Sequence, residues 1–119
     1  MNDEQLMRKM DLLSRKALIT WDYDSQLRQV VEEANELGVA VCKLARHKTG
    51  ETGIDSEKRI VVDDKYRHAA MEEMADMEVM LNQLKIMLGV IAGTLEAYEY
   101  LGIVSKKLEK LAVEIEEEE

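Results

Sequence analysis

The chain has 119 residues, of which 46% are hydrophobic and 34% are charged, and this composition is ordinary for one small globular domain or helical bundle. Sixteen basic residues against twenty-five acidic ones give a formal net charge of −9, which argues against binding to nucleic acid or to an anionic membrane, because both require a basic surface. An acidic protein that acts on an anionic substrate would therefore need a cation between the two.

Nothing in the sequence indicates membrane insertion, secretion or disulfide bonding. No segment approaches the roughly 18 consecutive apolar residues of a membrane span, and residues 1–11 lack the apolar core of a signal peptide. The single cysteine, Cys42, falls in an apolar phase of a predicted helix, so we expect it in the core. We therefore expect one domain over residues 1–119 in the reducing environment of the cytoplasm.

Apolar residues at intervals of three and four predict two helices in the first part of the chain. The first covers residues 3–18 and ends at a short break, Thr20–Asp24. The second helix runs from this break to about Lys48. Its capping residue is one of Asp22, Asp24 or Ser25.

The rest of the chain predicts a loop and two further helices. Residues 49–64 form the loop, with a brief extended piece at residues 59–62. Helices follow over residues 64–88 and residues 95–115, and the acidic residues 116–119 form a solvated, frayed tail. The predicted fold class is all-α, an antiparallel bundle of about four helices.

Two glutamates of the second helix lie close to its apolar stripe. At about 100° per residue the stripe centres near Ala34, Glu33 falls at its edge, and Glu36 lies about 60° beyond. A spacing of three makes the two glutamates neighbours on the helix surface, so they can share one target.

The third helix carries Glu73 and Asp76 although it is apolar on nearly every side. Such a helix is expected to be buried, and a buried, unpaired carboxylate is strongly unfavourable. Basic partners are few in this chain, and a hard divalent cation would satisfy the acids instead. Oxygen-only ligands favour Mg²⁺ or Mn²⁺ over zinc or copper.

The acids have two other interpretations. An acidic pair three residues apart is usually a solvated helix face, and the chain would then be a non-enzymatic helical oligomerisation module. A ferritin-like di-iron site needs Glu-x-x-His pairs, and no glutamate here is followed by histidine at that spacing.

The two acidic motifs resemble those of the MazG-like, all-alpha nucleoside triphosphate pyrophosphatase superfamily. Its EExxE motif corresponds to residues 32–36 (EEANE), and its ExxD motif to residues 73–76 (EMAD). A tryptophan and a Ser-Gln pair before the first motif, as in small phage-type members, correspond to Trp21, Ser25 and Gln26. One departure is that 36 residues separate Glu36 from Glu73, more than in compact members.

The resemblance implies antiparallel helices that assemble into dimers or tetramers. It further implies Mg²⁺, or Mn²⁺, held by Glu33, Glu36, Glu73 and Asp76, and a water that attacks the α-phosphorus of a nucleoside triphosphate to release pyrophosphate. Glu32 or Glu36 would accept the proton, and the sequence does not choose between them. Phosphoribosyl-ATP pyrophosphatase shares the fold and the acids and is an alternative activity; whether the task is cleansing of the nucleotide pool is open.

Six residues are candidates for substrate binding. Trp21 can stack on a base or cap the helix junction, and Gln26 can hydrogen-bond a base edge or be an ordinary surface residue. Lys43 and His47 continue from the acidic face and can meet phosphates, or form an ordinary solvated helix end. Asn82 and Lys85 lie one and two turns beyond Asp76, and Lys85 points away from the acids of its own helix, so it would act in a neighbouring subunit.

The third helix also predicts a homo-oligomer. It is apolar on two sides, through Met74, Met77, Leu81 and Leu84 on one and Ala75, Val79 and Ile86 on the other. A chain with four helices can cover one of these sides, so we expect a second copy to cover the other.

Overall fold

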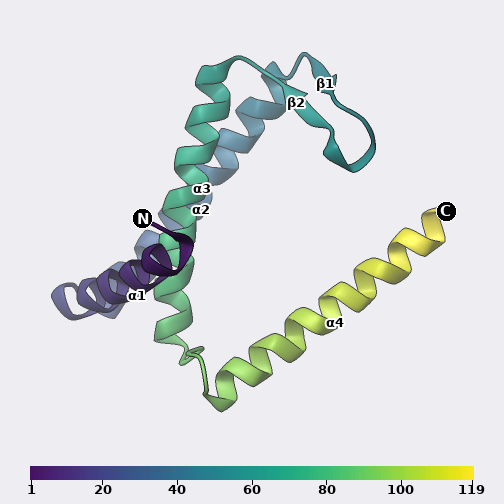
Figure 1. Ribbon diagram of the computed structural model, residues 1–119. Helices are drawn as coiled ribbons and strands as arrows, with labels where there is room; N and C mark the ends of the chain where they lie inside the picture. The colour runs from purple at the N-terminus through teal and green to yellow at the C-terminus, as the bar shows by residue number, and fades with distance from the viewer. The chain divides into compact units, whose positions relative to one another are not determined.

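The computed structural model describes residues 1–119, and most of them are helical (Figure 1). The helices are α1 (Asp3–Thr20), α2 (Tyr23–His47), α3 (Asp64–Met87) and α4 (Leu95–Glu118). A short 3₁₀ turn, η1 (Asp55–Glu57), lies between two strands, β1 (Gly50–Thr52) and β2 (Arg59–Val61). The prediction of a mostly helical chain is confirmed, and α4 continues through the acidic tail that we expected to fray.

Local capping interactions explain where three of the helices begin. Asn2 and Gln5 form a reciprocal capping box at α1. The carboxylate of Asp22 accepts a hydrogen bond from the backbone N–H of Ser25 at 2.7 Å, as expected for the cap of α2. Thr94 caps α4 through the N–H of Ala97. The break before α2 is only Trp21 and Asp22, shorter than the predicted break over Thr20–Asp24.

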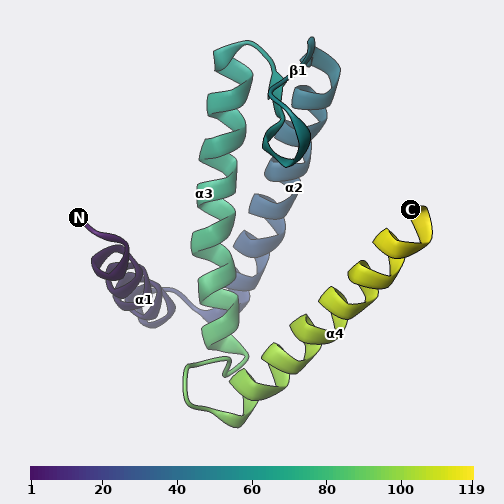
Figure 2. The same cartoon turned by 45° about the vertical axis from the view of Figure 1, so that its right-hand side comes forward.

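Helices α2 and α3 run side by side in opposite directions, as both views show (Figures 1 and 2). A small antiparallel hairpin joins them, in which Gly50 pairs with Val61 and Thr52 with Arg59. The extended piece expected after residue 58 is therefore confirmed, whereas its partner β1 was missed because Gly-Glu-Thr has no apolar alternation. Gly53 is required in the turn, because its φ is 97° and a Cβ there would lie 2.9 Å from the carbonyl oxygen of Glu57.

The chain divides into two compact units, Met1–Leu84 and Lys85–Glu119, and the assignment of one domain stays a prediction. The first unit buries few apolar side chains, namely Leu18, Ala40, Ala70 and Met80. It also buries three polar ones, Ser14, Gln26 and Gln83. In the second unit, the ammonium of Lys85 lies 5.1 Å from the ring centroid of Tyr100.

The face of α2 that packs in the first unit is not the one that hydrophobicity indicated. Leu27, Val31 and Val41, on the apolar stripe, are exposed, whereas Gln26 and Ala40 are buried. The expectation that Cys42 lies in the core is wrong, since it is exposed. The expectation that α3 is buried on nearly every side is also wrong for the single chain, because Met74 is 59% exposed and Val79 is 41% exposed.

No helix combines the length and the apolar character that crossing a membrane requires.

Candidate functional site

Polar side chains from α2 and α3 line one continuous strip of the first unit. On α2 they recur at intervals of three, four or seven residues, which keeps them on one side of the helix: Gln26, Gln29, Glu33, Glu36, Lys43 and His47. On α3 they are Tyr66, Glu73, Asp76 and Gln83. Because the helices are antiparallel, the amides share one end of the strip, the acids share the middle, and Lys43, His47 and Tyr66 share the other end.

Three of the four predicted metal ligands converge in the middle of this strip. Glu33, Glu73 and Asp76 each offer one carboxylate oxygen, and these oxygens all lie within 4.8 Å of one another. Glu33 and Glu73 are half-buried, whereas Asp76 is exposed. One oxygen of Glu33 accepts a hydrogen bond from the Gln29 amide at 2.9 Å. The second oxygen of Glu33 and one oxygen of Glu73 are buried without any hydrogen-bond partner.

The electrostatics of the cluster are unfavourable without a cation. Burial raises the pKa of the Glu33 carboxyl above its usual value of 4.5, and repulsion by Glu36 and Asp76 acts in the same direction. The hydrogen bond from Gln29 opposes this shift in the pKa. No ion pair of the chain involves any of these acids. The cluster therefore holds negative charge that no basic side chain neutralises.

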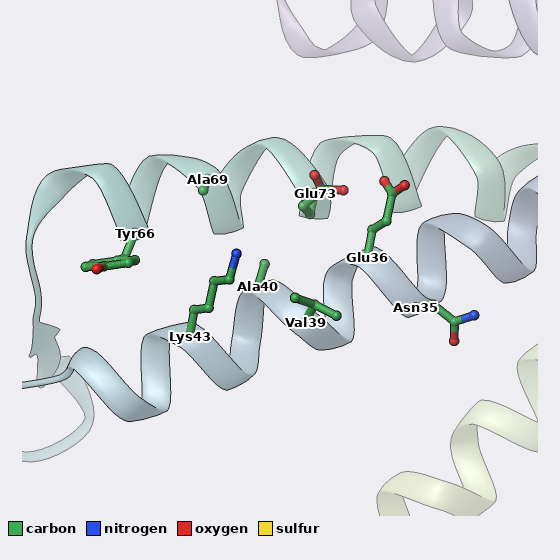
Figure 3. Close-up of a pocket in the computed structure, with 8 residues that line it drawn as sticks. All are labelled: Asn35, Glu36, Val39, Ala40, Lys43, Tyr66, Ala69 and Glu73. Carbon is green, nitrogen blue, oxygen red and sulfur yellow. The ribbon is translucent and has the colours of Figure 1, made fainter.

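Glu36 lies beside the cluster rather than within the three-oxygen group. It lines a cleft of about 310 Å³ together with Glu73, and Figure 3 shows its carboxylate reaching from α2 toward α3. Glu32 is exposed and does not line this cleft. The two acids considered as proton acceptors therefore differ in position, with Glu36 facing the cleft.

Beyond the acids, the cleft leads to a basic and aromatic end. Figure 3 shows the ammonium of Lys43 directed from α2 into the space between Tyr66 and Glu73. Lys43 makes no ion pair. The ring of His47 stacks on that of Tyr66, with centroids 4.1 Å apart and planes 5° from parallel. The small side chains of Ala40 and Ala69 line the cleft beside Lys43 and leave room for a ligand.

On the other side of the acids lies a second cavity, of about 410 Å³. It is lined by one tryptophan, three glutamines and two other side chains. The lining residues are Trp21, Ser25, Gln26, Gln29, Met80 and Gln83. Gln83 was missed as a candidate. Its spacing of seven residues from Asp76, in the same phase as the acids, is the sequence signal that would have included it.

No family model, curated protein or solved structure matches this chain.

The last two substrate-binding candidates make other contacts. The Asn82 amide donates a hydrogen bond to the hydroxyl of Ser14 at 3.0 Å, and so it joins α3 to α1. Lys85 belongs to the second unit, where it contacts Tyr100.

The donor set of the cluster fits a hard divalent cation. It contains carboxylate oxygens only, which suits Mg²⁺ or Mn²⁺ and not a metal that prefers sulfur or imidazole. The two buried oxygens without partners would gain ligand bonds, and the repulsion among the acids would be relieved. The arrangement can thus hold a metal ion beside a cleft that contains a free lysine.

Proposed function

We propose that this chain is a Mg²⁺-dependent hydrolase that cleaves a nucleoside triphosphate to the monophosphate and pyrophosphate, as its likeness to MazG-like proteins implies. One observation carries the proposal. The acids of the two motifs, Glu33 on α2 and Glu73 and Asp76 on α3, lie together, and two of their oxygens are buried without partners. Acids of an ordinary solvated helix face would have their oxygens in water, and would not be expected to leave buried oxygens without a hydrogen-bond partner.

Glu33, Glu73 and Asp76 would hold the cation, with Glu36 as a fourth ligand from the edge of the cleft. When bound, Mg²⁺ supplies charge neutralisation and Lewis acidity for phosphoanhydride chemistry. Mn²⁺ would suit the same oxygen ligands. Gln29 orients Glu33 through its hydrogen bond and keeps one of its oxygens fixed.

Lys43 would bind phosphate oxygens of the substrate. Its ammonium faces the cleft without a carboxylate partner, and it offers three hydrogen-bond donors. The proton lost by the attacking water would go to Glu36. What supports Glu36 over Glu32 is that Glu36 lines the cleft beside Glu73, whereas Glu32 does not line it.

The proposed enzyme is a homo-oligomer. The exposed apolar stripe of α2, including Val31, and the exposed Met74 of α3 provide surface for a second copy. The second unit adds α4, a single helix whose stripe from Leu101 to Ile115 cannot be covered by that helix itself. The same apolar surface also favours the second candidate function, a helical oligomerisation module without enzymatic activity.

Pyrophosphate release from a panel of ribo- and deoxyribonucleoside triphosphates, and from phosphoribosyl-ATP, tests the proposal. We expect release that requires Mg²⁺ and is lost in Glu73→Gln. The matched control is Glu72→Gln, because Glu72 is exposed on the same helix and pairs only with His68. A folded oligomer that releases pyrophosphate from none of these compounds would favour the oligomerisation module.

A further inference from the structure

The cavity beside Trp21 contains two glutamines that are almost completely buried. Gln83 is 5% exposed and Gln26 is 8% exposed. The carbonyl oxygen of the Gln83 side chain is buried and has no hydrogen-bond partner within the protein. Gln83 lies on α3 in the same phase as the buried Met80, where an apolar side chain would pack well. A polar group at such a position is unfavourable unless a partner is supplied.

The partner is not supplied by the other polar groups of this cavity. The amide of Gln29 is engaged by Glu33, and the hydroxyl of Ser25 donates to the backbone carbonyl of Asp22. The buried carbonyl oxygen of Gln83 therefore remains without a partner, and Gln83 and Gln26 both line the cavity. Trp21 adds a broad aromatic face, 58% exposed, to the same lining.

We infer that this cavity binds the nucleobase of the substrate, with Gln83 reading the Watson–Crick edge of the base and Trp21 stacking on its face. The inference rests on the proposed function and names the part of the substrate that this end of the strip takes. A glutamine amide presents a donor beside an acceptor, and a base edge presents the complementary pair. Stacking of a base on an aromatic side chain is favourable for every base.

The charges that line the two cavities indicate which one would take the base and which one the phosphates. The cavity contains no charged side chain, whereas the cleft on the other side of the acids contains Lys43. A neutral, amide-bearing cavity suits an uncharged heterocycle. The base would therefore lie beside Trp21 and the phosphates would extend past the acids toward Lys43.

This geometry predicts a particular pattern of specificity. An amide can rotate to exchange its donor and acceptor, and every natural base has an N–H on its Watson–Crick edge, so the four bases should differ little. A base that has lost this N–H would leave the buried oxygen of Gln83 without a partner. Such a base should bind roughly 10- to 100-fold more weakly.

Trp21 allows the inference to be tested by binding alone, because it is the only tryptophan of the chain. UMP, N3-methyl-UMP and ribose 5-phosphate are titrated into the full-length protein while tryptophan fluorescence is recorded. Uridine is chosen because its Watson–Crick edge has a single N–H, which one methyl group removes. We expect saturable quenching by UMP and no quenching by ribose 5-phosphate. N3-methyl-UMP should bind more weakly than UMP, by a factor of about ten or more.

Two variants assign the effect to Gln83. Gln83→Met keeps the side-chain volume and should abolish the preference for UMP over N3-methyl-UMP. Val79→Ala is the control, because Val79 lies one turn away on α3 and lines only the neighbouring cavity on the side of α1. It should retain the preference, and circular dichroism checks that both variants fold.

The outcomes separate this inference from the proposed function. Equal quenching by UMP and N3-methyl-UMP, or an unchanged preference in Gln83→Met, overturns the inference even if the wild type hydrolyses triphosphates. Selective, Gln83-dependent binding of UMP supports the inference even if no triphosphate is hydrolysed, and in that case only the proposed reaction falls. A lack of UMP binding by an active wild type overturns the inference and leaves the reaction intact.

Discussion

Replacing Glu73 by glutamine should make the metal-free protein more stable and the Mg²⁺-saturated protein less stable than the wild type. Glu73 is half-buried, one of its oxygens has no partner, and it shares a site with Glu33 and Asp76. The amide has nearly the same shape as the carboxylate but carries no charge.

The size of the expected increase in stability of the metal-free variant follows from the separation of the charges. Two unit charges 4.8 Å apart repel each other by about 0.9 kcal/mol in a water-like dielectric and by about 3.5 kcal/mol at an effective dielectric constant near 20. Asp76 is exposed, so its repulsion lies near the lower value, whereas Glu33 is half-buried and its repulsion lies between the two. We expect a net stabilisation of about 1–2 kcal/mol, or about 5–10 °C in Tm for a domain of this size.

Magnesium should reverse the order of the two proteins. A cation at 100 times its Kd stabilises the wild type by about 2.7 kcal/mol, whereas Glu73→Gln lacks a ligand and should gain little. Thermal unfolding is followed by circular dichroism in EDTA and in 10 mM Mg²⁺, an excess on the order of 100-fold over a Kd near 0.1 mM. Glu72→Gln is the control and should shift with Mg²⁺ as the wild type does.

Two results would refute this reasoning. If Glu73→Gln unfolds at a lower temperature than the wild type in EDTA, the carboxylates do not repel one another in the fold as their geometry indicates. If Mg²⁺ raises the unfolding temperature of both proteins equally, the cation binds elsewhere and Glu73 is not a ligand.

Three further predictions concern the reaction, the pH dependence and the assembly. With a triphosphate substrate, chromatography in the absence of an inorganic pyrophosphatase should show the monophosphate and pyrophosphate; a diphosphate with orthophosphate would contradict the assigned cleavage. Because the pKa of Glu33 is raised in the fold, the folded protein binds this proton more tightly than the unfolded chain, so metal-free stability should fall as the pH rises from 4.5 through the raised pKa. Chemical denaturation across that range should show this loss in the wild type and less of it in Glu33→Gln. Light scattering at micromolar concentration should give two or four times 13.6 kDa, and an active monomer would contradict the assembly.

The sequence by itself determined the local features of this protein. Helix starts at Asp22 and Thr94 depend on a side chain reaching a backbone N–H three residues away, so they are encoded within one turn. The spacing of three within each acidic motif likewise makes Glu33 and Glu36, or Glu73 and Asp76, neighbours on one helix whatever surrounds them. For this reason the sequence alone predicts the helices and the candidate ligands.

Tertiary structure decided which helix face is buried and which residues from distant segments meet. Hydrophobic periodicity shows that α2 has an apolar face, but it does not identify the partner that covers it. In the first unit α2 and α3 are packed with the small Ala40 and Ala70 buried, and the stripe through Val31 is exposed. In this pairing Cys42 is exposed and Gln83 is buried.

The meeting of the two acidic motifs depends on the hairpin as well as on the helices. The chain between Glu36 and Glu73 contains the end of α2, strands β1 and β2 and the start of α3, and its 36 residues gave no indication of the axial register. Backbone pairing of Gly50 with Val61 fixes that register by joining residues eleven positions apart. The oxygens of Glu33, Glu73 and Asp76 come within 4.8 Å of one another through this long-range pairing, because no local interaction along either helix could align the two motifs.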